Sequence, residues 1–411
     1  MSLTRSPAAG GVHAKPGMAE RPALTVLLLA LLLGIQPVTT DLYLPALPAL
    51  TAGFGAGMAH AQLTLTALLL AFGLSQLVLG PLSDRFGRRP VLLCGLLAYV
   101  AAAIGSAVAP SIELLIGWRA VQGAAMGAAV MCARAIVRDL YLPADGARVM
   151  SRALTGLGVI ACLCAPLGGL VSDLFGWRAA LMLLALFGAG TLALVALRFD
   201  ETLPQRRLDA LAPRALVATW ATVLRHPTFL SFTALTTAAY GLLFTFLAAS
   251  SFTFIQVLGL SKTQYGLVML YGSAVYIGGT FLCRWLLPRY GVRGSVARGA
   301  ALSLAGGSAI GLLALAGVQT VWAIVAPFTL VMLGHGIHQP CGQTGALGPF
   351  PQAAGAASAL NGFVMMLAAF GIGGWLGVRM DGTVMPLALG IWFWSACIAL
   401  VAWTVVRKHG H

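Results

Sequence analysis

Charged residues are scarce in this chain. Only 9% of its 411 residues are Asp, Glu, Lys or Arg, whereas 59% are hydrophobic, and the mean hydropathy is +0.91. Soluble domains carry about 25% charged residues, so lipid must surround most of this protein. Backbone polar groups in lipid must be paired within the fold, which leaves helices or a closed barrel. The apolar runs extend for about 20 residues or more, which predicts membrane-spanning helices rather than short strands.

Acidic residues and lysines are the rarest charged residues. Asp and Glu total 11 against 25 Lys and Arg, a formal net charge of +14, and the lysines are Lys15, Lys262 and Lys408. Such a basic chain invites a nucleic-acid interpretation. The arginines, however, lie in short gaps between apolar runs, on one set of loops. This distribution follows the positive-inside rule, excludes a nucleic-acid partner and predicts that both termini are cytoplasmic.

Several catalytic and binding signatures are missing. The sequence has no Gly-Lys pair and therefore no P-loop for nucleotide phosphates, and no HExxH or GxSxG motif. None of the seven cysteines forms a CxxC pair, so they are expected to be buried free thiols. His335 and His338 have no evident third partner for a metal ion. We expect no enzymatic activity, cofactor or metal; a membrane-embedded enzyme or a sensor is a distant alternative.

The apolar runs predict twelve membrane spans. Their expected ranges are 23–50, 60–82, 90–109, 112–137, 149–173, 177–198, 228–257, 263–287, 294–317, 320–347, 353–379 and 383–406. The first run is too long for a signal peptide, so we expect it to be retained. The longest polar stretch between spans is a linker that separates two six-helix halves. The predicted parts of the chain are a tail (1–22), a six-helix half (23–198), the linker (199–227), a second six-helix half (228–406) and a tail (407–411).

The two halves contain a weak internal repeat. Residues 84–89, Asp-Arg-Phe-Gly-Arg-Arg, follow the second span, and residues 288–293, Pro-Arg-Tyr-Gly-Val-Arg, follow the eighth. Four of the six positions agree in character, at equivalent places in the two halves. Parallel halves with a substrate site between them are typical of secondary transporters.

Three motifs resemble those of a known family. Residues 80–90, Gly-Pro-Leu-Ser-Asp-Arg-Phe-Gly-Arg-Arg-Pro, resemble the signature between spans 2 and 3 of the major facilitator superfamily; we call them the signature loop. Residues 115–123, Leu-Ile-Gly-Trp-Arg-Ala-Val-Gln-Gly, resemble the span 4 motif of drug:proton antiporters. Residues 41–48, Asp-Leu-Tyr-Leu-Pro-Ala-Leu-Pro, are similar to the hallmark of the Bcr/CflA subgroup.

The resemblance implies an all-α major facilitator fold, with twelve helices in two six-helix halves around a central cavity. It also implies a monomer in the bacterial inner membrane that exports small organic compounds in exchange for protons, by alternating access. Chloramphenicol-like drugs, bicyclic antibiotics and nucleosides fit this function. The alternative on the same scaffold is efflux or uptake of a specific metabolite, such as a nucleoside or an amino-acid derivative.

One motif departs from the family pattern. The antiporter motif of span 5 expects Gly-Pro, two residues, then Gly-Gly. Here residues 165–169 read Ala-Pro-Leu-Gly-Gly, with alanine first and one residue fewer. Pro166, Gly168 and Gly169 are the residues that match, and the departure weakens what the resemblance implies about antiport and about substrate.

Asp41 is the acidic residue that lies deepest in a predicted span, and Arg119 is the arginine that lies deepest in one. An ionised carboxylate at such a place costs about 2.5–3.5 kcal/mol, so it must be paired, hydrated or protonated. The helix rise puts Asp41 about 6 Å and Arg119 about 10 Å below the same face, near enough for an ion pair. We predict that Asp41 binds a proton or a cationic substrate; the resemblance implies that Arg119 takes part in coupling. The alternatives are an interfacial cap for Asp41 and a structural ion pair in the cavity wall for Arg119.

Polar residues in other spans are candidates to line the cavity. His335, Gln339 and Gln343 recur every four residues and form one stripe of a helix. Polar packing around Pro340, which interrupts that helix, is the alternative. The remaining cavity candidates are Gln36, Tyr43, Gln122, Met126, Tyr240, His338 and Asn361.

The signature loop predicts a conformational latch. Its residues in this role are Gly80, Asp84, Arg85, Gly87, Arg88 and Arg89. The positive N-terminus of span 11 is expected at the same membrane face, so Asp84 can dock there in one state and leave in the other. Positive-inside topology alone is the alternative; it explains the arginines but neither Asp84 nor Gly87.

Overall fold

The computed structural model describes residues 22–141, 143–203, 212–350 and 353–409, and their regular secondary structure is entirely helical. The helices of this described part include eleven segments that are long and apolar enough to cross a membrane. Ten of the twelve predicted spans have a helical segment of their own, with ends within several residues of the prediction, and the other two share one segment. The prediction of an all-α membrane protein is confirmed.

The first span is broken rather than continuous. Helix α1 (Pro22–Asp41) is followed by a 3₁₀ turn, η2 (Leu44–Ala46), and by α2 (Leu47–Gly53). Prolines occupy the first turns of η2 and α2, where the missing N–H does no harm. Asp41 is therefore the last residue of α1, and the chain continues helically for a further twelve residues to Gly53. The helical rise of one continuous span, on which the expected depth of about 6 Å rested, does not apply across this break.

Five long helices complete the first half of the bundle. They are α3 (Met58–Phe86), α4 (Arg88–Ala107), α5 (Ile112–Leu140), α6 (Pro143–Phe175) and α7 (Trp177–Arg198). A short helix that the sequence did not predict, α8 (Pro213–Leu224), lies within the expected linker. The second half consists of α9 (Pro227–Phe252), the π-helix η3 (Thr253–Val257), α10 (Lys262–Leu315), α11 (Val321–Leu347), α12 (Ala354–Arg379), α13 (Met385–Val401), the π-helix η5 (Ala402–Val406) and α14 (Arg407–His409).

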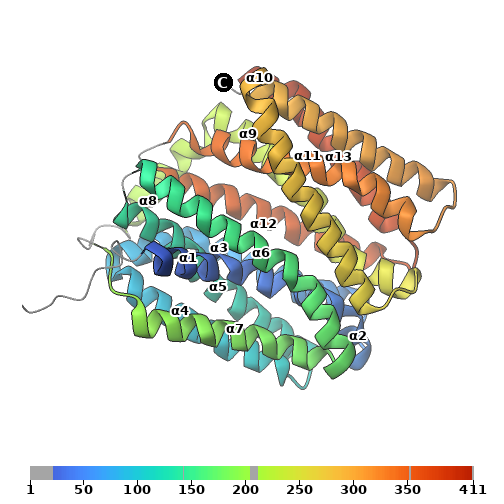
Figure 1. The fold of residues 1–411 in the computed structure, drawn as a ribbon, viewed down its shortest axis with the longest axis horizontal. Coiled ribbons are helices and arrows are strands. Elements are labelled where there is room, and N and C mark those ends of the chain that lie inside the picture. Colours follow the sequence, from blue (N-terminus) through green and yellow to red (C-terminus); the bar gives the residue numbers. More distant parts are fainter. Residues whose placement is uncertain (1–21, 142, 204–211, 351–352, 410–411) are drawn as a thin grey trace, which may run out of the picture.

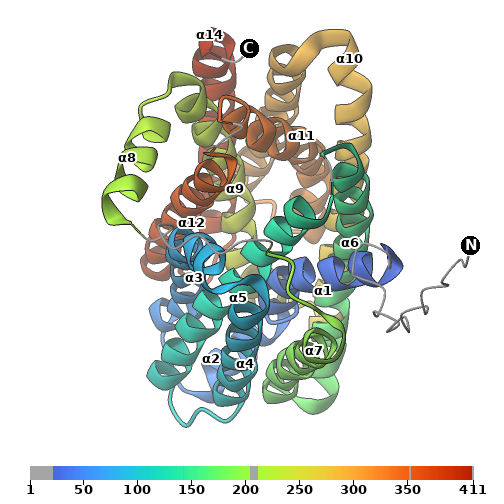
Figure 2. The same cartoon turned by 90° about the vertical axis from the view of Figure 1, so that its left-hand side faces the viewer.

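Helix α10 contains two membrane spans. Its 54 residues would extend about 81 Å as one straight helix, far beyond a hydrocarbon core of about 30 Å. Gly291 breaks it with φ 63° and ψ −176°, a conformation that favours glycine. Figure 2 shows the ribbon of α10 doubling back on itself. The eleven segments, one of which crosses twice, therefore give twelve crossings in the described part of the chain.

The two halves lie side by side and meet mainly through two pairs of helices. Helices α1–α7 form one group and α9–α13 the other, with α12 against α3 and α10 against α6 (Figure 1). We call the end with the turns at Gly87 and Gly291 the arginine-rich end. The opposite end, with the turns at Gly55, Gly176 and Gly317, is the arginine-poor end.

Candidate functional site

A cavity of about 310 Å³ lies between the two halves. Its walls come from α1, α3 and α6 on one side and from α9, α10 and α11 on the other. Most of its lining is aliphatic or aromatic, with a few polar groups. Among its lining residues Asp41 provides the only carboxylate, and none is a lysine or an arginine. A mostly apolar pocket with few polar groups is the usual form of a small-molecule site.

Asp41 reaches the cavity because α1 ends beside it. Pro37 removes one backbone donor from the last turns of α1, and the Thr40 hydroxyl donates back to the Gln36 carbonyl at 3.1 Å. Both features bend or end helices. The Asp41 carboxylate accepts a hydrogen bond from the Thr40 hydroxyl at 2.8 Å and makes no ion pair with a basic residue of the described part. A carboxylate without a counter-charge in an apolar cavity can be stabilised by a proton or by a cationic ligand.

Aromatic rings form the opposite wall. Phe246 and Phe328 are stacked with their centroids 3.9 Å apart, and Tyr276 lies 5.6 Å from the His335 ring. All four residues line the cavity. Aromatic faces attract organic cations and stack with flat molecules. The cavity thus combines one negative charge with aromatic surfaces on which a hydrophobic ring can lie.

Four of the ten predicted cavity residues line the cavity. These four are Gln36, Tyr240, His335 and Gln339. The other six lie elsewhere in this structure: Tyr43, Gln122, Met126, His338 and Asn361 are buried between helices, and Gln343 is exposed. Helix periodicity correctly predicted that His335 and Gln339 of α11 line the cavity. Gln343, the third member of the same stripe, does not line it. The sequence analysis missed Thr40, Ser273, Tyr276 and the phenylalanines of the aromatic wall.

Arg119 lies behind the cavity wall and does not pair with Asp41. Its guanidinium is fully buried and donates to the Thr39 carbonyl at 3.0 Å and to the Gln122 side chain at 2.7 Å. It also lies 4.3 Å from the centroid of the Tyr43 ring. The ion pair that equal depths suggested is absent among the described residues. Arg119 reaches Asp41 only indirectly, through the backbone of α1 two residues earlier.

The remaining buried candidates are held by neighbouring hydroxyl groups. Asn361 on α12 accepts a hydrogen bond from Thr236 on α9 at 2.9 Å. His338 lies 3.4 Å from the Ser303 hydroxyl on α10. Both contacts stay within the second half, so they position its helices relative to one another.

The antiporter-motif residues bring α6 into backbone contact with two other segments. A Cβ atom on Gly168 would overlap the carbonyl of Leu42, the residue after Asp41. A Cβ atom on Gly169 would overlap the carbonyl of Lys262 at the start of α10. Pro166 lies within α6, and its Cα would be 2.7 Å from a Cβ built on Gly266. The motif therefore packs against the break in the first span and against the second half.

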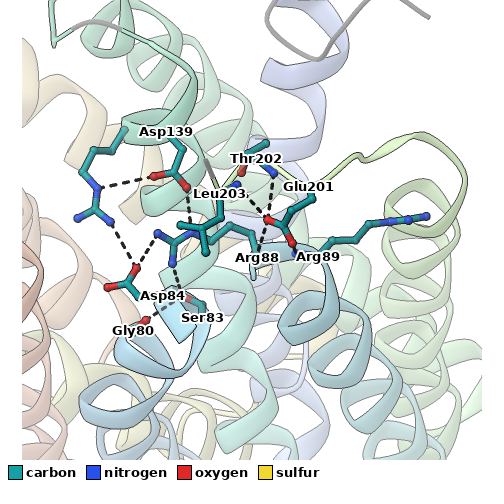
Figure 3. A network of polar contacts seen from close by, with 10 residues as sticks. Gly80, Ser83, Asp84, Arg88, Arg89, Asp139, Glu201, Thr202 and Leu203 are labelled. Atoms are coloured by element: carbon teal, nitrogen blue, oxygen red, sulfur yellow. Dashed lines mark hydrogen bonds and ion pairs between the residues drawn. The ribbon is translucent and has the colours of Figure 1, made fainter. Parts of the chain in front are cut away.

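The signature loop is held by a network of carboxylates, shown in Figure 3. Arg88 bonds to Asp84 at 2.6 Å and to Asp139 at 2.9 Å. Arg138 lies 3.7 Å from the same Asp84 carboxylate. In this structure Asp84 is therefore engaged by arginines. The first turns of α12 are instead contacted from α5, where Arg134 donates to the Ser358 hydroxyl at 2.7 Å.

The start of α4 is capped by a residue from the linker. The Glu201 carboxylate accepts hydrogen bonds from the backbone N–H groups of Arg88 at 2.9 Å and Arg89 at 3.2 Å (Figure 3). A negative charge at this position stabilises the helix N-terminus. Gly87 has φ 106°, and a Cβ there would also overlap the Glu201 carboxylate, so only glycine fits. The roles of Glu201 and Asp139 were not predicted from the sequence. The one signal for them is that each is a rare acidic residue close to loop arginines.

The other members of the signature loop have simpler contacts. The Gly80 carbonyl accepts a hydrogen bond from the Ser83 hydroxyl at 2.8 Å. Arg85 lies 5.6 Å from the centroid of the Phe86 ring. Arg89 donates to the Ala196 carbonyl at the end of α7 at 3.0 Å. The loop is thus tied to α5 and α7 of the first half and to the linker that follows it.

Replacing Glu201 with glutamine is expected to destabilise the start of α4 by about 1 kcal/mol, because charge-assisted hydrogen bonds become neutral ones. Hydrogen exchange followed by mass spectrometry should show faster exchange in the peptide that contains Arg88 and Arg89. The matched control is Asp200→Asn, which removes a charge from the exposed neighbouring residue. Equal exchange in the two variants would contradict the capping role.

Comparison with known proteins agrees with this architecture. The family model described as Major Facilitator Superfamily matches residues 29–374. The chain belongs to the major facilitator superfamily. This membership makes it a multi-pass membrane transporter rather than an enzyme, and the family predicted from the motifs is confirmed.

Two relatives carry names that refer to drug resistance. The chain is 32% identical over 345 residues to a "Chloramphenicol resistance protein" of Pseudomonas aeruginosa, covering 82% of this chain and 80% of that protein. It is 29% identical over 345 residues to "Multidrug resistance protein D" of Escherichia coli strain K12, covering 84% and 86% of the two chains.

A solved structure shares the fold at low sequence identity. The xylose transporter of E. coli, in a partially occluded inward-open conformation, superposes with a TM-score of 0.73 and 14% identity. The match covers 95% of this chain and 98% of that chain. The predicted major facilitator fold, with two six-helix halves around a central cavity, is therefore confirmed.

Proposed function

We propose that this transporter exports small organic compounds, including drugs, in exchange for protons. The observation that carries the proposal is the Asp41 carboxylate, which faces the cavity between the halves without a basic partner. A proton and a cationic compound can each neutralise it, but not both together. Binding of one therefore displaces the other, which is the requirement for exchange. The names of the curated relatives support a drug as the organic substrate.

The aromatic wall gives the substrate its chemical class. Phe246, Phe328 and Tyr276 offer ring faces, and Gln36 and Gln339 offer hydrogen bonds beside them. A flat, largely apolar molecule with a cationic or strongly polar group fits this combination. Chloramphenicol-like compounds without a charge can also bind through these polar groups. For such compounds Asp41 would act only as the proton site.

The proposed orientation places the arginine-rich end in the cytoplasm of a bacterial cell, with the protein in the inner membrane. At the arginine-poor end the buried Gln62 side chain of α3 donates to the Ala248 carbonyl of α9 at 2.8 Å. This bond joins the two halves on the side that would face outward. A bond between the halves on that side supports loading from the cytoplasm, as export requires.

The remaining parts are assigned roles in alternating access. We propose that segments 23–198 and 228–406 move as the two halves, joined by the linker 199–227, and that tails 1–22 and 407–411 are cytoplasmic. The signature loop serves as the latch: Asp84 leaves Arg88 and docks on the N-terminus of α12 in the other state. The proton gradient drives the cycle, with about 2.3 kcal/mol per charge for each 100 mV.

The test is transport by the purified protein in liposomes. An imposed outward proton gradient, with the liposome interior more acidic than the medium, should drive accumulation of ethidium, a flat organic cation. Chloramphenicol and a nucleoside should be compared with it. Collapse of the gradient with a protonophore should abolish accumulation. Transport that persists after collapse would refute proton coupling, and transport of the nucleoside alone would favour the metabolite alternative.

A further inference from the structure

A polar contact joins the two halves at the arginine-poor end. The Asp173 carboxylate, in the last turn of α6, accepts hydrogen bonds from the backbone N–H of Thr263 at 2.9 Å and from its hydroxyl at 2.7 Å. The Lys262 ammonium lies 3.6 Å from the same carboxylate and donates to the Ser172 carbonyl at 3.0 Å. Asp173 belongs to the first half, and Lys262 and Thr263 begin α10 of the second half.

This contact is not needed to begin α10. Ser261 and Gln264 already form a complete capping box: the Ser261 hydroxyl accepts from the Gln264 N–H at 3.1 Å, and the Gln264 side chain accepts from the Ser261 N–H at 2.9 Å. The helix is therefore stabilised by its own residues. Asp173 binds a further exposed N–H, at the positive end of the helix dipole. Its effect is to hold one half against the other.

Close backbone packing surrounds the contact. Gly169 lies against the Lys262 carbonyl, and Gly266 lies against Pro166, so no side chain separates α6 from α10 at these points. Farther along α6, towards the arginine-rich end, Leu157 and Ala161 line the cavity. Figure 1 shows α6 and α10 close together at one end and diverging towards the other. The two helices thus meet where Asp173 bonds to α10.

We propose that Asp173, Lys262 and Thr263 form a lock that keeps the arginine-poor end closed and must open in each transport cycle. The role of this lock rests on alternating access, as proposed above. Its contacts, however, are present in the protein without substrate. When α6 and α10 separate, the carboxylate and the Thr263 N–H both become exposed to water. Water then replaces both partners, so the lock biases the equilibrium between the two states without making opening prohibitive.

The first experiment measures the conformational equilibrium without substrate. Spin labels on cysteines at Leu114 and Val318, two exposed positions in opposite halves at the arginine-poor end, would report their separation in a background free of other cysteines. Asp173→Ala is expected to increase the ratio of long to short distances about tenfold, because charge-assisted bonds across the halves are lost. The matched control Asp381→Ala removes an exposed carboxylate at the same end, whose side-chain hydrogen bonds within the described residues go to nearby Thr383. An unchanged distribution in Asp173→Ala would overturn the proposal.

The second experiment prevents the lock from opening. Asp173→Cys combined with Thr263→Cys should cross-link under mild oxidation, stop transport completely, and recover after reduction. Each single cysteine variant should transport equally before and after oxidation. A cross-linked protein that still transports would overturn the lock. A protein that transports none of the compounds, but whose label distances respond to Asp173→Ala, would instead contradict only the proposed function.

Discussion

Replacing Asp41 with asparagine is expected to abolish proton release on addition of substrate and to weaken binding of a cationic compound about a hundredfold. A carboxylate about 6 Å from a bound cation, at an effective dielectric constant of about 20, contributes about 2.8 kcal/mol, which is about a hundredfold in affinity. Asparagine keeps the size of the side chain but can neither lose a proton nor carry a charge. The measurement is proton release from detergent-solubilised protein in weak buffer, as ethidium is added.

The matched control for this experiment is Asp381→Asn. Hydrogen bonds from the side chain and backbone of Thr383 lower the pKa of Asp381, so this exposed carboxylate is ionised near neutral pH and does not buffer. Its variant should release as many protons as the original protein. Proton release that persists in Asp41→Asn would contradict the role of Asp41. Binding without proton release in the original protein would indicate a uniporter, a symporter or another coupling ion.

Replacing Gly168 with valine is expected to destabilise the protein by about 3 kcal/mol and to reduce efflux at least about tenfold. The new Cβ would overlap the Leu42 carbonyl. The backbone fixes the position of a Cβ atom, and the Leu42 carbonyl is itself backbone, so no rotamer change relieves the contact. Helix α6 must therefore move away from the break in the first span. This movement displaces Asp41 relative to Tyr240 on the opposite wall. The measurements are the thermal unfolding midpoint in detergent and efflux from liposomes.

Gly158→Val is the matched control, because Gly158 lies on the same helix and a Cβ atom added there would meet no neighbouring atom within 4 Å. It should unfold at the temperature of the original protein and transport normally. Equal behaviour of the two variants would show that the approach of α6 to Leu42 is unimportant. A loss of stability in Gly168→Val with full transport would separate packing from the position of Asp41.

The helices and the family could be predicted from sequence, because a membrane span is a local property of about 20 residues. The predicted range 177–198 coincides with α7. Gly291 is the instructive case: the helical conformation continues on both sides of it, yet the polar residues around it correctly indicated two spans.

The cavity lining was harder to predict, because it depends on how helices rotate against one another. Tyr43 and Asp41 are two residues apart, yet the break after α1 sends the Asp41 side chain into the cavity while the Tyr43 hydroxyl bonds to Thr64 at 2.6 Å. Sequence position likewise gave no warning that Arg119 binds backbone carbonyls. The partners of Arg88 were missed because they are 51 and 113 residues away in the chain.

The turns at Gly87 and Gly291 share a bend but not a charged network. Both glycines keep a positive φ, of 106° and 63°, at the same place in the repeat. The residues that build the carboxylate network did not keep their identity: Pro288 stands where the first half has Asp84, and Val292 where it has Arg88. The bend is therefore common to the two turns, whereas Asp84 and Arg88, which build the charged network of the first half, have uncharged counterparts in the second half.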